Sequence, residues 1–134
     1  MRAGRRSGRE RGSVSLEIAV LGPALLLLVF TIVQASMWFY ARSLALAAAE
    51  EGVAAGRAYG NPPAAGVQAA SAWLERNAGD SLLNSGVALI EAGPSRVAIE
   101  VRGQALSVLP GIAGVPVRQV AYGPVERFTT AGTP

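Results

Sequence analysis

An uncharged, mostly apolar run from Ile18 to Ala41, 24 residues long, limits the possible folds more than any other feature of the sequence. A helix of this length covers roughly 36 Å, more than the hydrocarbon core of a bilayer at about 30 Å. Trp38 and Tyr40 lie at its end and Arg42 follows, and such residues favour the membrane–water interface. We therefore predict a membrane-spanning helix over residues 13–41 with Trp38, Tyr40 and Arg42 as interfacial anchors. The alternative is a buried helix of a soluble domain.

Positive charge is concentrated before this run. The first eleven residues contain five Arg and one Glu, whereas the chain from Arg42 onward contains seven Arg and seven acidic residues. Because the cytoplasmic flank of a span carries the positive excess, we predict a cytoplasmic N-terminus and an extracytoplasmic C-terminal region. Residues 1–12 are predicted to be a disordered basic leader. A charge confined to one tail does not indicate a nucleic-acid-binding surface.

The residues after the span indicate a small α+β region. Residues 42–60 are rich in Ala, the best helix former, and should extend the first helix out of the membrane until Gly60 and the following Asn-Pro-Pro end it. A second helix is predicted from about Pro63 to Asn77, with an apolar stripe that includes Val67 and Leu74. Residues 61–134 are predicted to form a small extracytoplasmic region.

Strands are expected over residues 87–91, 97–102 and 115–122. Val97, Ile99 and Val101 alternate with Ala98, Glu100 and Arg102, a period of two that predicts one buried face and one solvated face. Residues 106–114 are predicted to be a loop, and the last dozen residues a frayed tail. The fold class is therefore α+β: a long N-terminal transmembrane helix, a second helix and an antiparallel sheet of about three strands.

Catalysis is not indicated by the residue types present. The chain contains no His, Cys or Lys to activate a nucleophile or bind a metal ion, and it has no phosphate-binding glycine loop. We predict that the protein is not an enzyme and has no catalytic residues, metal, cofactor or small-molecule substrate. Gly52, Gly56 and Gly60 have the spacing of a helix-dimerisation motif, but they follow the membrane exit, so this signal is weak.

A basic tail ending in Gly12, a carboxylate at Glu17 and the start of the apolar run coincide at the beginning of the span. An acid at the edge of a membrane helix usually has a partner, although Glu17 alone could be an interfacial residue. The arrangement resembles the signal sequence of prepilins and pseudopilins. The resemblance implies cleavage by a prepilin peptidase between Gly12 and Ser13, and pairing of the Glu17 carboxylate with the new N-terminal amine of a neighbouring subunit.

The block over residues 11–57, with Glu17 followed by an apolar run containing Pro23, is similar to TadE-like and TadG-like proteins. These are minor pilin-type components of tight-adherence (Flp-type) pilus loci. The similarity implies a pilin-like fold and a structural role in the bacterial cytoplasmic membrane, beside other pilin subunits and the Tad assembly machinery. Whether the chain enters a filament is left open. Ser13 departs from the Phe or Met that many pilins have at the first mature position, so methylation there is not implied.

Gly22 and Pro23 lie within the predicted span. Proline removes a helical hydrogen bond and clashes with the preceding turn, so we expect a kink that serves packing in a filament. Membrane helices also tolerate such pairs without a functional reason.

Two other classes of protein compete with the pilin interpretation. Small residues at positions 45–47 and 47–49 match an ordinary secretory cleavage site, which would release a soluble binding module. The second competing class is an uncleaved signal-anchor protein with an extracytoplasmic binding domain. Neither alternative explains Gly12 and Glu17.

Overall fold

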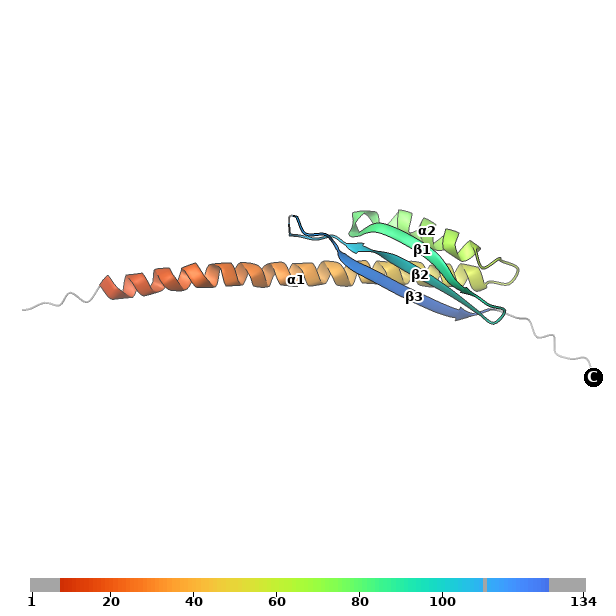
Figure 1. Cartoon of the computed structure of the whole chain (residues 1–134), viewed down its shortest axis with the longest axis horizontal. Coiled ribbons are helices and arrows are strands. Elements are labelled where there is room, and N and C mark those ends of the chain that lie inside the picture. Colours follow the sequence, from red (N-terminus) through yellow and green to blue (C-terminus); the bar gives the residue numbers. More distant parts are fainter. Residues whose placement is uncertain (1–7, 110, 126–134) are drawn as a thin grey trace, which may run out of the picture.

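The computed structural model describes residues 8–109 and 111–125. The elements are helices α1 (Gly8–Arg57) and α2 (Ala65–Asn77), a short 3-10 turn η1 (Gly79–Ser81), and strands β1 (Leu82–Ala92), β2 (Arg96–Ala105) and β3 (Val115–Pro124). The predicted α+β class, with its long first helix and three antiparallel strands, is confirmed. Figure 1 shows α1 as a rod whose C-terminal half carries all the other elements.

The environment of α1 changes along its length. From Val14 to Val33 its large apolar side chains are exposed, whereas beyond residue 40 one face is buried in the domain. That face consists of Ala41, Leu44, Ala45, Ala48, Ala49 and Val53. Most of these side chains are small, which lets the sheet lie close to the helix. One continuous helix thus joins an uncovered apolar segment to the core of a folded domain.

The predicted start of α1 needs correction, whereas its predicted end near residue 58 is confirmed. The helix begins at Gly8, so the expectation of a disordered leader is wrong for residues 8–12, while residues 1–7 lie outside the described residues. It ends at Arg57, a turn before Gly60, whose positive φ of 81° suits glycine. The second helix begins at Ala65 rather than Pro63.

The glycine spacing in α1 serves contact within the chain. A Cβ added at Gly52 would lie 2.8 Å from the carbonyl oxygen of Gly66 in α2. One added at Gly56 would lie 3.0 Å from the carbonyl oxygen of Pro63. The two helices therefore approach backbone to backbone, and Gly52 and Gly56 face α2 and the connection leading to it.

The sheet has the order β1-β2-β3, and both helices lie on one of its faces, α1 beneath β2 and β3 and α2 beneath β1. Val97, Ile99 and Val101 of β2 are fully buried, as their alternation predicted. Strand β1 starts at Leu82, earlier than expected. Its register with β2 shifts between Leu83 and Gly86, where Asn84 has a positive φ of 50°. β3 extends to Pro124, and residues 126–134 of the expected frayed tail lie outside the described residues.

The prediction of a solvated second face on β2 is wrong for Ala98 and Glu100, which are both fully buried. β2 is the central strand, so β1 and β3 flank it on both sides. Tyr122 stands opposite Ala98 in the ladder, and Arg118 stands opposite Arg102, two pairs beyond the partner of Glu100. Neighbouring side chains, rather than a second layer of structure, cover this face.

Candidate functional site

The N-terminal part of α1 contains the residues that the sequence singled out first. Gly12 and Ser13 lie within the helix, and their side chains are not described. Glu17 is exposed on α1, and neither of the salt bridges among the described residues involves it. The most apolar stretch of the helix has a mean hydropathy of 2.5, and none of its residues is buried by the described part of the chain.

Pro23 lies inside α1, and the helix continues through it without interruption. An added Cβ at Gly22 would meet nothing within 4 Å, so no described neighbour requires a glycine there. The kink at Gly22 and Pro23 stays a prediction.

The three predicted interfacial anchors differ in their surroundings. The Trp38 indole Nε1 donates a hydrogen bond to the carbonyl oxygen of Pro116 at 3.3 Å, so this ring is fixed to the start of β3. The Arg42 guanidinium carbon lies 5.6 Å from the centre of the Trp38 ring, within the range of a cation–π contact. Tyr40 is exposed. Trp38 therefore binds the domain as well as lying near the expected membrane rim.

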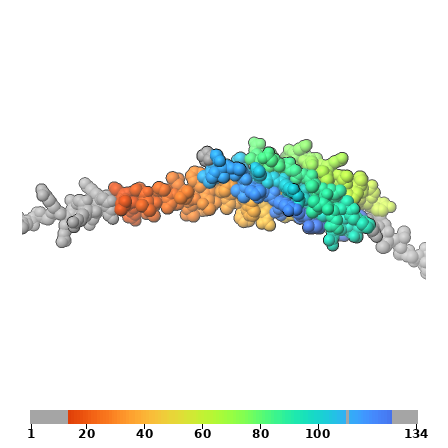
Figure 2. Space-filling model, in the orientation of Figure 1, coloured from red at the N-terminus to blue at the C-terminus, as the bar shows by residue number. Residues whose placement is uncertain are grey.

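A contact between Gln34 and the loop before β3 was not visible in the sequence. The Gln34 amide nitrogen donates to the carbonyl oxygen of Leu106 at 3.2 Å, and its amide oxygen accepts from the backbone nitrogen of Val108 at 3.0 Å. Beyond this clamp, a groove of about 390 Å³ runs between one face of α1, from Leu27 to Trp38, and Leu109 and Val115. In Figure 2 the loop and the start of β3 lie against the orange part of α1.

An ionic cluster on the open face of the sheet was also missed. The Glu100 carboxylate is fully buried and accepts hydrogen bonds from Arg102 on its own strand and from Arg118 on β3. Burial opposes ionisation of this carboxyl, but the hydrogen bonds and charges of the two guanidinium groups outweigh it and hold the pKa of Glu100 below its usual 4.5. Both Arg side chains are largely exposed, so the cluster is a charged surface feature.

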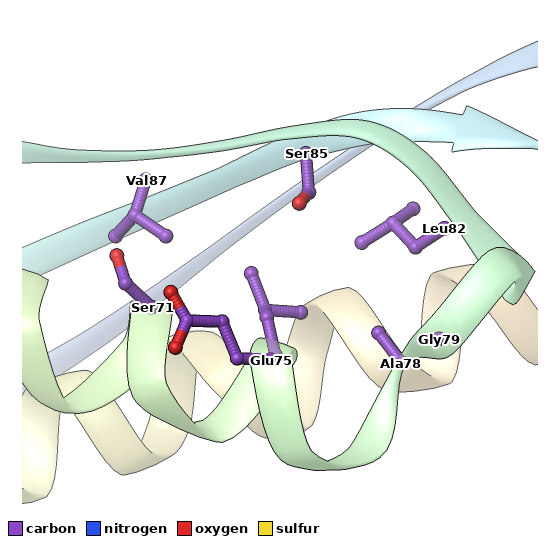
Figure 3. A pocket seen from close by; sticks show the side chains of 8 residues that line it. Ser71, Glu75, Ala78, Gly79, Leu82, Ser85 and Val87 are labelled. Carbon is purple, nitrogen blue, oxygen red and sulfur yellow. The ribbon is translucent and has the colours of Figure 1, made fainter.

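A cavity of about 320 Å³ lies between α2 and β1 (Figure 3). Ser71 and Glu75 extend from α2 toward Val87, and Ser85 extends from β1. The remaining lining is mostly apolar, and the described residues hold no cluster of three or more potential metal ligands.

Comparison with known families finds one match, to the model described as TadE-like protein, over residues 12–54. The match covers Gly12, Glu17, the apolar run and the buried face of α1 from Ala41 to Val53, and it confirms the suspected resemblance over these residues. No curated protein and no solved structure matches the chain. The candidate membrane helix near the N-terminus fits a single-pass membrane protein, and the family match associates the chain with the Tad pilus.

Proposed function

We propose that this chain, TadE-like over residues 12–54, is a minor pilin or pseudopilin that assists assembly or anchoring of a Flp-type pilus or a related secretion apparatus. Its role is structural rather than catalytic, and it requires no cofactor. The observation that carries the proposal is the continuity of α1, which is exposed and apolar over residues 14–33 and forms part of the domain core beyond residue 40. A subunit built in this way can be held in a membrane and later moved as one body.

Processing by a prepilin peptidase between Gly12 and Ser13 is the first step of the proposed role. It removes the basic leader and leaves a mature chain in which Glu17 is the fifth residue. The positive flank keeps this site on the cytoplasmic side of the bacterial membrane, with the domain on the opposite side.

Glu17 is proposed to pair with the N-terminal amine of a neighbouring subunit. A carboxylate at the edge of an apolar helix is costly without a counter-charge, and cleavage creates an amine one helical turn away from it. Its exposure on α1 leaves it accessible to another chain. The neighbouring subunits and the peptidase are therefore the expected partners.

Cleavage at the ordinary secretory sites would disrupt the hydrophobic core of the folded domain. Ala45, Ala48 and Ala49 of the small-residue cleavage patterns are fully buried in the folded domain. Cleavage after Ala47 or Ala49 would remove Ala41, Leu44 and Ala45 from the hydrophobic cluster. A domain released in this way would lose a large part of the apolar surface that α1 buries against β2 and β3.

The mature N-terminus, measured by mass spectrometry of protein from host membranes, tests the processing step. A chain starting at Ser13 is expected. Gly12→Val should block this cleavage, whereas Gly8→Val, a matched change earlier in the leader, should leave it intact. A start near Ala48 or Glu50 would establish secretory cleavage and overturn the proposal.

The carboxylate is tested separately from processing. Glu17→Ala should leave cleavage at Ser13 unchanged but abolish co-purification with other pilus subunits. Glu51→Ala is the matched control, because Glu51 is an exposed glutamate on the same helix beyond the apolar run. Unchanged assembly of Glu17→Ala would disprove the pairing role.

A further inference from the structure

The groove between α1 and the loop before β3 lies where the helix leaves the membrane. About 20 helical residues cross a hydrocarbon core of about 30 Å, so a span counted from Val14 or from Ile18 ends between residues 33 and 37. The Gln34 clamp to Leu106 and Val108 falls within this interval. The groove, whose α1 side runs from Leu27 to Trp38, therefore lies in the leaflet nearest the domain.

The loop has the composition and the hydrogen bonding of a segment that meets lipid. No charged residue occurs between Arg102 and Arg118. Leu109 and Ile112 are exposed, as is Val115 at the start of β3. The Leu109 backbone N–H donates to the Ser107 hydroxyl, and the Ile112 backbone N–H donates to the Leu109 carbonyl oxygen. Irregular backbone beside hydrocarbon needs such internal partners, because lipid offers none.

We propose that this groove binds one phospholipid of the leaflet nearest the domain. The α1 side of the groove runs over twelve residues, from Leu27 to Trp38, a rise of about 16 Å, which matches half of a hydrocarbon core of about 30 Å. An acyl chain lies against Leu27, Phe30 and Leu109. Its phosphate lies near Arg42, which follows Trp38 by one turn on the same helical face and is exposed. Neither salt bridge of the described residues involves Arg42.

The bound lipid fixes the height of the domain above the membrane. The Gln34 hydrogen bonds hold the loop to α1, and the Trp38 hydrogen bond holds the start of β3 to it. The lipid fills the remaining gap between α1 and these two segments. The proposal depends on single-pass anchoring alone and not on the pilus role, so the two can fail independently.

Native mass spectrometry of the full chain, released from mild detergent, tests the site. The wild type should retain one phospholipid. Arg42→Gln and Leu109→Arg should each lose most of this adduct, and Arg96→Gln, a matched change at the distant β1–β2 hairpin, should keep it. Absence of the adduct from the wild type, or its full retention by both groove variants, would overturn the proposal. A lipid-free dimer that Leu109→Arg dissociates would assign the groove to a second copy instead.

The two tryptophans provide a second measurement in bilayers with acyl-brominated phospholipid. With Trp73→Phe, the fluorescence of the remaining Trp38 should be strongly quenched by bromine. With Trp38→Phe, the remaining Trp73, which packs against the domain core from α2, should retain its intensity. Equal quenching of the two, or none at Trp38, would contradict a lipid in the groove.

Discussion

The close approach of α1 and α2 gives the strongest stability prediction, for Gly66→Ala. The new Cβ would collide with the carbonyl oxygen and carbon of Gly52, and it would also lie 3.2 Å from the Ile99 Cδ1 atom. Two of these three contacts are backbone atoms of a helix, so they cannot move aside by rotating a side chain. The helices must separate, and overpacking of this kind costs up to about 3 kcal/mol.

Part of that cost is offset, because alanine is a better helix former than glycine by about 1 kcal/mol. The net loss is therefore about 2 kcal/mol, or roughly 10 °C in melting temperature for a domain of this size. Gly52→Ala should act in the same direction, since its Cβ would lie 2.8 Å from the Gly66 oxygen. The double variant should lose less unfolding free energy than the two single variants lose together, because one separation of the helices relieves both collisions.

Thermal unfolding of the full chain in detergent, followed by tryptophan fluorescence, measures the effect. Gly86→Ala is the control, because an added Cβ there meets nothing within 4 Å. A melting temperature for Gly66→Ala that equals or exceeds that of Gly86→Ala would show that the helices do not touch backbone to backbone. If the stability losses of Gly52→Ala and Gly66→Ala were strictly additive in the double variant, a single separation of the helices could not be their common cause.

Three further predictions concern the ionic cluster and the loop. Because the folded-state pKa of Glu100 is depressed below 4.5, its contribution to stability is full above about pH 4.5 and is lost as the pH falls through the lowered value. Melting temperatures measured across this range should fall more steeply for the wild type than for Glu100→Gln, and parallel curves would contradict the role of the cluster. Gln34→Leu removes the acceptor of the Val108 amide, so hydrogen exchange at that amide should accelerate roughly five-fold for a hydrogen bond worth about 1 kcal/mol. Trp38→Phe loses the hydrogen bond to Pro116 and should lower the unfolding free energy by about 1 kcal/mol; an unchanged denaturant midpoint would show that the bond contributes nothing.

Periodicity and composition were sufficient to predict the elements of this fold. The uncharged run, the Ala-rich extension and the alternation of Val97, Ile99 and Val101 are local signals, and each corresponds to an observed helix or strand. The start of β1 was missed because Asn84, Ser85 and Gly86 are common in turns, and the register shift that accommodates them depends on pairing with β2.

The missed features of the candidate sites depend on contacts between distant parts of the chain. Glu100 and Arg102 lie two residues apart, but burial of the carboxylate also needs Arg118, and only the β2–β3 register brings that residue alongside. Gln34 lies 74 residues before Val108, and a lone glutamine in an apolar run gives no sign of what it will bind. The roles proposed for Gly12 and Glu17 are predictions from their spacing alone, which can be recognised in the sequence without tertiary structure.

The absence of a break in α1 between its exposed apolar segment and the domain also has a mechanical consequence. A force applied near Glu17 passes along the hydrogen-bonded helix directly into the layer beneath β2 and β3, with no flexible linker to absorb it. The load then acts along the packing interface of α1 with the sheet and α2, so the whole interface resists it together. Withdrawal of the helix from a bilayer would therefore displace the domain by an equal distance and leave its strand pairing unstretched.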